Sequence, residues 1–133
     1  MANRSVTADL DFSAAAYIAD LAIGGHRLRA DEPAENGGGD TGPTPTEILL
    51  SALGACTSIT LRMYAERKHW PVSAIHVDLS YAERSPGKTV IARKLRVDGD
   101  LDDEQRARLL QIANACPVHK ILTGTIEIPT ELS

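Results

Sequence analysis

Aromatic residues are scarce in this chain, at 4% of 133 residues, whereas hydrophobic residues of all kinds reach 43%. A core built from this chain must therefore consist mainly of aliphatic and small side chains. An excess of positive charge is also missing, because the net charge is −4 at pH 7. That balance argues against a nucleic-acid or anionic-membrane partner. The length suits a single domain over residues 1–133.

Long apolar runs and a leader sequence are missing too. No stretch of about 18 residues is apolar throughout, so we expect no membrane-spanning segment. The first twelve residues, MANRSVTADLDF, lack the apolar centre of a signal peptide. These features together predict a soluble, cytoplasmic protein with no membrane partner.

Cysteine is limited to two residues, Cys56 and Cys116, and the chain has no C-x-x-C pair. In a reducing compartment a permanent disulfide is not expected, so each thiol is reactive, metal-bound or inert. A buried cysteine is by itself more often a small hydrophobe than a nucleophile. Burial also raises the pKa of a thiol, so Cys56 would need a nearby cation or hydrogen-bond donor to become a thiolate.

Zinc binding is one possible use of these cysteines. Cys116 and His119 have C-x-x-H spacing, and Cys56 would add a third soft ligand. A fourth ligand is not evident in the sequence. We therefore expect no metal and no organic cofactor.

The most strongly patterned stretch is 44–68, TPTEILLSALGACTSITLRMYAERK, which predicts one long helix. Thr44 and Glu47 have the spacing of a capping box, Pro45 fits the first helical position, and Pro71 ends the pattern. The first half is apolar nearly all round, so it should be buried on every side. A chain this short can hardly bury such a helix alone, which predicts a partner chain.

The segment before this helix reads as three strands and a loop. Apolar alternation predicts strands over 5–11, 16–23 and 26–30, with Gly24-Gly25 as a hairpin turn. Residues 31–42 are rich in glycine and acidic residues and predict a mobile loop. This loop is either a lid or rim of a site or a solvated connector.

After the long helix, the pattern predicts a second hairpin followed by a helix and a closing strand. The elements are strands over 73–82 and 89–97, a helix over 103–115, a helical turn over 118–122 and a strand over 125–128. Ile91, Leu95 and Val97 are the inward candidates of the second hairpin strand. Asp102 and Gln105 form a capping box before the helix. The order of elements predicts an α+β fold.

Basic residues gather on the second hairpin, and we interpret them as a solvated face. They are Arg84, Lys88, Arg93, Lys94 and Arg96. His26, His69 and His76 are isolated in the sequence, and we interpret each as a surface or strand-face residue.

Four segments resemble the OsmC/Ohr family of thiol-dependent peroxidases, and the match extends over nearly the whole chain. They are HRLRADEP (26–33), GGGDTGPTP (37–45), ALGACTSITLRMYA (52–65) and ACPVHK (115–120). One cysteine inside a long helix, with a second directly before a proline near the C-terminus, is a specific combination. Within the family, the resemblance is to the broad OsmC-like subgroup.

The resemblance implies an OsmC-like fold in an intertwined homodimer, with long central helices packed together and the site at the interface. It also implies that Cys56 attacks an organic hydroperoxide and becomes a sulfenic acid. Cys116 would then condense with it to a disulfide, which a dithiol reductant opens again. The alternative is a non-enzymatic dimer that binds small apolar or electrophilic molecules in the same pocket.

The chain departs from the family where the reactive thiol would be activated. In the best-studied members, a glutamate directly after the helix-opening proline holds an arginine over the reactive sulfur. This chain has Thr46 at the glutamate position, with Glu47 one residue later, and PheSerAlaAlaAla in the turn that carries the arginine. Arg29 and Glu47 are the candidate substitutes for this pair.

Overall fold

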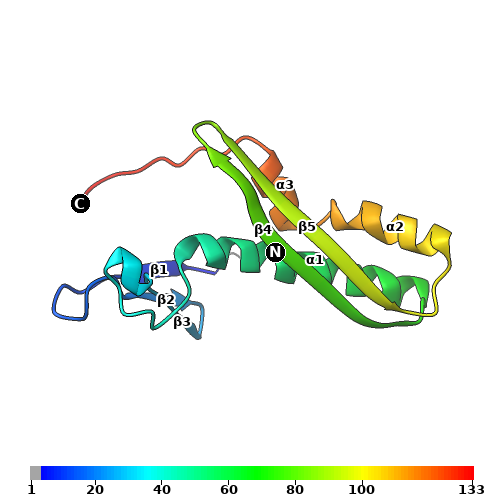
Figure 1. Ribbon diagram of the computed structural model, residues 1–133, viewed down its shortest axis with the longest axis horizontal. Coiled ribbons are helices and arrows are strands. Elements are labelled where there is room, and N and C mark those ends of the chain that lie inside the picture. The colour runs from blue at the N-terminus through cyan, green and yellow to red at the C-terminus, as the bar shows by residue number, and fades with distance from the viewer. Residues whose placement is uncertain (1–3) are drawn as a thin grey trace. The chain divides into compact units, whose positions relative to one another are not determined.

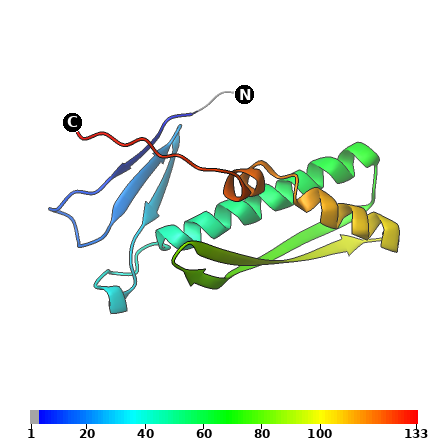
Figure 2. The ribbon, with the colours of Figure 1, turned by 90° about the horizontal axis from the view of Figure 1, so that it is seen from above.

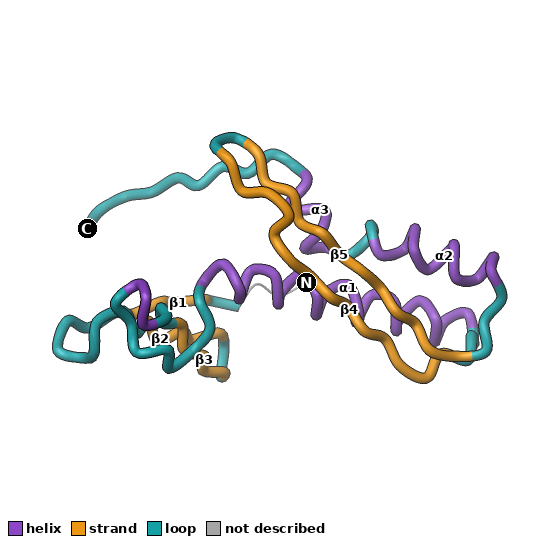
Figure 3. Tube along the Cα trace, viewed as in Figure 1, coloured by secondary structure: helices purple, strands orange, loops and turns teal. Residues whose placement is uncertain are grey.

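The computed structural model describes residues 4–133, which form an α+β arrangement of five strands and four helical segments within this range (Figures 1 and 3). The elements are β1 (Val6–Asp9), β2 (Ala19–Ile23), β3 (His26–Ala30), η1 (Ala34–Asn36), α1 (Pro45–Lys68), β4 (Val72–Ser85), β5 (Lys88–Gly99), α2 (Asp103–Ala113) and α3 (Pro117–Thr123). The chain divides into two compact units, one up to Leu49 and one from Leu50 onward. The expected single domain over 1–133 stays a prediction.

The first unit is built on an antiparallel sheet in the order β1-β2-β3. Ile23 pairs with His26, so Gly24-Gly25 forms the two-residue turn that the sequence predicts. Gly24 has a φ of 58°, which glycine adopts without strain. All four β1 residues are exposed, and the only buried side chains described in this unit are Ala30 and Asp31. The first unit therefore has almost no core of its own.

The loop over 31–42 closes on itself around the carboxylate of Asp31. This side chain accepts hydrogen bonds from the Glu32 N–H at 2.8 Å and from the Thr41 N–H and hydroxyl at 3.0 and 2.6 Å. The bonds from Thr41, followed by that from Glu32, hold the pKa of Asp31 below its usual value. The composition of the loop did not indicate this internal structure or the short helix η1.

Helix α1 begins as the sequence predicts. The Glu47 N–H donates to the Thr44 hydroxyl at 3.3 Å, and the Thr44 N–H donates to the Glu47 carboxylate at 2.8 Å. This reciprocal pair is a capping box, and Pro45 occupies the first helical position. The helix ends at Lys68, one residue before His69, whose φ of 58° lies in the left-handed region.

Within one chain, α1 is buried along one side. Its buried residues form one stripe at four-residue spacing, namely Leu53, Thr57, Leu61 and Ala65. By contrast, Leu49 and Ile59 in the first half are 42% and 54% exposed. The described residues of one chain therefore cover only one side of the first half, and its burial on the other sides by a partner chain stays a prediction.

Helix α1 is long and apolar enough to cross a membrane, judged by length and composition alone, and 22% of its most apolar window is buried. The core helix of a soluble protein passes the same test. The expected absence of a membrane partner stays a prediction.

In the second unit, α1 and α2 pack on one face of the β4–β5 hairpin (Figure 2). Leu61 of α1 meets Leu109 and Ala113 of α2 at the centre of this core. The partly buried residues around them are Tyr64, Trp70, Val72, Ile75, Leu95, Val97, Leu101 and Ile112. A Cβ atom on Gly54 would lie 2.7 Å from the Leu79 side chain, so glycine permits α1 to approach β4 closely.

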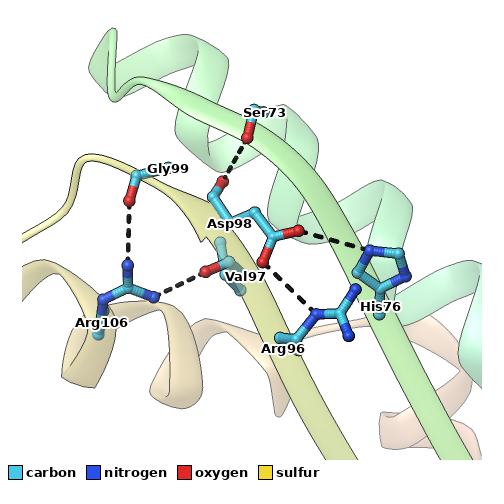
Figure 4. Close-up of polar contacts among 7 residues, drawn as sticks. All are labelled: Ser73, His76, Arg96, Val97, Asp98, Gly99 and Arg106. Carbon is cyan, nitrogen blue, oxygen red and sulfur yellow. Dashed lines mark hydrogen bonds and ion pairs between the residues drawn. The ribbon is translucent and has the colours of Figure 1, made fainter.

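Side-chain bonds fasten α2 to the end of β5 (Figure 4). Arg106 donates to the carbonyl oxygens of Val97 at 2.7 Å and Gly99 at 3.0 Å. The Asp98 carboxylate of β5 pairs with His76 of β4 and with Arg96 of β5. The two bonds from Arg106 attach α2 to the end of β5.

The capping box of Asp102 and Gln105 is present, and α2 ends at Ala113, two residues before the predicted end. The helical turn predicted over 118–122 is confirmed as α3. The predicted closing strand over 125–128 is wrong, because these residues have no regular structure and pair with no described strand.

Candidate active site

The structure brings Cys56 and Cys116 together, although sixty positions separate them in the chain. Cys56 lies in the middle of α1 and is half-buried, whereas Cys116 is fully buried at the start of α3. The Val118 N–H donates to the Cys56 sulfur at 3.5 Å, and the His119 N–H donates to the Cys116 sulfur at 3.3 Å. The two thiols also influence the pKa of each other. Their catalytic role stays a prediction.

The local sequence explains why Cys116 presents its sulfur to this turn. Cys116 is extended, with φ −67° and ψ 139°, and Pro117 occupies the first turn of α3. Proline suits that position because its fixed φ matches the helix and its missing N–H would have no partner there. Cys116 is consequently the N-cap of α3, and its sulfur takes the hydrogen bond that a serine or aspartate usually accepts.

The two thiols differ in their electrostatics. Burial raises the pKa of Cys56 above its usual value, and the N–H of Val118 only partly offsets this. Burial also raises the pKa of Cys116. This effect is outweighed, and the pKa is lowered, by four groups: the His119 N–H, the Cys56 thiol, the Thr57 hydroxyl and the charge of Arg93. Because the pKa of Cys116 is lowered and that of Cys56 is raised, Cys116 is the thiol that ionises first.

Arg93 is the cation of this site, and the structure holds it with four hydrogen bonds. Its Nη1 donates to the Thr57 hydroxyl at 3.1 Å and to the Ala113 carbonyl at 3.4 Å. Its Nη2 donates to Asn114 Oδ1 at 2.9 Å and to His119 Nδ1 at 3.2 Å. Residues of α1, α2, the segment after α2 and α3 thus converge on one guanidinium.

His119 is neutral in this arrangement. An arginine can only donate, so the Nδ1 atom that faces Arg93 must be an acceptor and the ring proton must be on Nε2. Burial first, and then the charge of Arg93, lower the pKa of His119. His119 therefore adds no second positive charge beside Cys116.

Thr57 of α1 lies between Arg93 and Cys116 and contacts both. Its hydroxyl donates to the Leu53 carbonyl at 2.7 Å, accepts from Arg93 at 3.1 Å and lies 3.8 Å from the Cys116 sulfur. The residue is fully buried, so these contacts leave its hydroxyl satisfied.

The predicted substitutes for the family's arginine and glutamate have other contacts. Arg29 is paired with Asp20 at 3.6 Å between β2 and β3, and both side chains are well exposed. Glu47 bonds Thr44 in the capping box. The supporting roles of Arg29 and Glu47 stay predictions, and structural contacts account for both positions.

Arg93 was missed by the sequence reasoning, which placed it on a solvated face with the other basic residues of the hairpin. The signal was present, because Arg93 has the same parity along β5 as the inward candidates Ile91, Leu95 and Val97. In the ladder it lies opposite Leu79, which points to the helices. Within residues 4–133, no group of three or more metal-ligating side chains gathers.

Comparison with known proteins connects this site to a family. The family model described as OsmC-like protein matches residues 37–131, which include α1, both cysteines and Arg93. The chain belongs to this family. No curated protein matches it at a significant level.

Solved structures agree on the fold. An OsmC-like protein from Mycoplasma pneumoniae superimposes with a TM-score of 0.75 at 18% identity, covering 91% of this chain and 87% of that one. The organic hydroperoxide resistance protein OsmC from Legionella pneumophila gives 0.66 at 18% identity, covering 93% and 91%. The organic hydroperoxide resistance protein OhrB of Bacillus subtilis gives 0.61 at 24% identity, covering 91% and 90%. The chain thus has the OsmC-like α+β fold.

Proposed function

We propose that this protein reduces organic hydroperoxides with its two thiols and so protects the cell against oxidative stress. The observation that carries the proposal is the meeting of Cys56 and Cys116, whose sulfurs accept hydrogen bonds from consecutive N–H groups of α3. Membership of the OsmC-like family supports it. So do the names of the Legionella and Bacillus structures, which describe organic hydroperoxide resistance.

In the proposed reaction, the Cys56 thiolate attacks one oxygen of the hydroperoxide and the O–O bond breaks. Cys56 becomes a sulfenic acid, and the departing alkoxide takes up a proton to give the alcohol. The Cys116 thiolate then attacks the Cys56 sulfur, a disulfide forms, and hydroxide leaves and is protonated to water. A dithiol reductant returns two electrons and restores both thiols. No metal or organic cofactor takes part.

We also propose that the protein works as a homodimer with its site at the interface. The exposed side of α1 includes large apolar residues, with Ile59 and Met63 mostly open to solvent, and the first unit has almost no core. A groove of about 460 Å³ beside the C-terminal half of α1 includes Ile59 and Trp70 but neither cysteine. A second copy that covers this side of α1 would bury the exposed apolar residues and complete a substrate pocket.

The proposal is tested by mixing the reduced protein with tert-butyl hydroperoxide and a dithiol such as dihydrolipoamide, and measuring peroxide consumption. We expect catalytic turnover by the native chain and none by Cys56→Ser. The double variant Cys56→Ser/Cys116→Ser is the control for peroxide consumed by the dithiol alone. If the native chain consumes no more peroxide than this control, the proposed activity is refuted.

The second candidate function is a non-enzymatic dimer that binds small apolar or electrophilic molecules. One observation favours it: burial raises the pKa of Cys56, which makes a weak nucleophile at neutral pH. This reading predicts that both single-serine variants bind such a ligand as the native chain does, with no turnover in any of them.

A further inference from the structure

Within the proposed peroxidase reaction, on which this inference rests, the chain lacks the family's activating pair at the expected positions. It nevertheless places one guanidinium in hydrogen-bonding contact with Thr57 and His119, both of which contact Cys116. We propose that Arg93 is the counter-cation of Cys116, so that the resting site holds its negative charge on the buried sulfur and Cys56 as a neutral thiol. Arg93 is then a positioning residue, because it acts on the substrate through the two sulfurs.

The contacts around Cys116 favour an anion there. The His119 N–H donates to its sulfur at 3.3 Å. The Thr57 hydroxyl, which accepts a hydrogen bond from Arg93 at 3.1 Å, lies 3.8 Å from the same sulfur. Charge-assisted hydrogen bonds of this kind stabilise the thiolate over the thiol. Cys56, by contrast, is only partly buried, and the Val118 N–H that donates to its sulfur at 3.5 Å has no described contact with Arg93.

Arg93 is the charged group among the residues described around Cys116 and the Arg93 guanidinium. From α1 come Cys56 and Thr57, from α2 and the segment after it the Ala113 carbonyl and Asn114, and from α3 His119, which is neutral. Among the contacts that the structure describes at this site, Arg93 is the cation and none is with a carboxylate.

With this distribution of charge, Cys116 acts as a general base before it forms the disulfide. As the hydroperoxide arrives, Cys56 passes its proton to the Cys116 thiolate and attacks the peroxide oxygen with the electron pair that remains. The proton then moves from Cys116 to the alkoxide, which leaves as the alcohol. Cys116 is again a thiolate and attacks the Cys56 sulfenic acid. Over the whole sequence, one thiol, one thiolate and one hydroperoxide give a disulfide, an alcohol and a hydroxide ion.

The test is a pH titration of thiolate absorbance at 240 nm in the Cys56→Ser background, where Cys116 is the only thiol. This readout needs no reagent to reach the buried sulfur. Arg93→Gln should move the midpoint to higher pH and lower the thiolate signal at neutral pH by about tenfold. Arg93→Lys, which keeps the charge, should retain most of the signal.

The matched control is Arg96→Gln, because Arg96 is on the same strand but pairs with Asp98 on the other face. It should leave the midpoint unchanged. If Arg93→Gln leaves the midpoint unchanged, or if Arg96→Gln shifts it equally, the inference is overturned. Should Arg93→Gln not fold, Asn114→Ala removes one of the two acceptors of Nη2 while keeping the charge. It must shift the midpoint in the same direction, and an unchanged midpoint would refute the role of Arg93.

The titration is independent of peroxide consumption, so the two proposals fail separately. Turnover by the native chain with no effect of Arg93 on the midpoint would refute the inference and leave the peroxidase function standing. A shifted midpoint in a chain that consumes no peroxide would refute the function and leave the charge assignment standing.

Discussion

Cys56 and Cys116 accept hydrogen bonds from consecutive N–H groups of α3, yet their burial and their pKa values differ. Cys56 is half-buried, and burial raises its pKa. Cys116 is fully buried, but donors and the charge of Arg93 lower its pKa. Burial alone therefore does not decide which thiol ionises; the number and charge of the donors around the sulfur decide it.

The largest expected effect follows from removing Cys56, the more accessible of the two thiols. Cys56→Ser should abolish peroxide consumption completely, since serine is not oxidised by hydroperoxides and Cys116 has no solvent exposure. The loss is measured as residual hydroperoxide after incubation with the reduced variant. Circular dichroism checks that the variant is folded. Consumption at the native rate would show that Cys116 or another group is the nucleophile.

Cys116→Ser should have the next largest effect. The variant can still be oxidised once at Cys56, because the attacking sulfur is present, but no intramolecular disulfide can form. Trapping with dimedone, which reacts with sulfenic acids, should label Cys56 in this variant and not in the native chain. Equal labelling of both proteins would mean that Cys116 does not resolve the sulfenic acid.

Removing the Thr57 hydroxyl, which lies between Arg93 and Cys116, should lower the stability of the fold. Thr57→Val deletes an acceptor of Arg93 and a partner of Cys116, and should lower the free energy of unfolding by about 1–3 kcal/mol. Thr57→Ser keeps the hydroxyl and should cost about 1 kcal/mol or less. Urea unfolding under reducing conditions measures both. A loss for Thr57→Ser as large as that for Thr57→Val would show that the hydroxyl contributes no more than the methyl group.

The smallest effect is a difference in pH dependence between the two thiols. Because the pKa of Cys116 is lowered in the folded chain, its contribution to stability grows as pH rises through the folded pKa toward the usual thiol value. Because the pKa of Cys56 is raised, its contribution is present below the usual value and is lost as pH rises through the folded pKa.

Urea unfolding of reduced native chain and single-serine variants between about pH 7 and 10, around the usual thiol pKa, measures this difference. From neutral pH upward, the native chain should gain stability relative to Cys116→Ser. Relative to Cys56→Ser, it should lose stability. Each effect is limited to about 1.4 kcal/mol per pH unit. Slopes of the same sign for both variants would contradict the assignment of charge to Cys116.

The sequence predicted most of the fold because its signals were local. The capping boxes at Thr44 and Asp102, the Gly24-Gly25 turn and the paired strands of both hairpins all appear in the structure. The strand over 125–128 failed for the same reason: its alternation is a local property, but a strand also needs a partner, which the sequence does not show. Likewise, the apolar surface of α1 did not reveal that one chain covers a single stripe.

The site was predicted less completely than the fold. The pairing of Cys56 with Cys116 came from family resemblance, because no local pattern links positions that far apart. Arg93 was overlooked since charged residues on a hairpin are usually solvated, although its parity with Leu95 placed it on the inward row. A basic residue in register with an apolar row is thus a useful sign of a buried charge with a function.

The most direct test of the central claim, that Cys56 and Cys116 form one redox pair, is intact mass under non-reducing conditions. The reduced chain is measured before and after one equivalent of an organic hydroperoxide. We predict the loss of two hydrogens per chain, with both thiols blocked to alkylation after denaturation. An unchanged mass with both thiols free would contradict the account and leave ligand binding as the function to test.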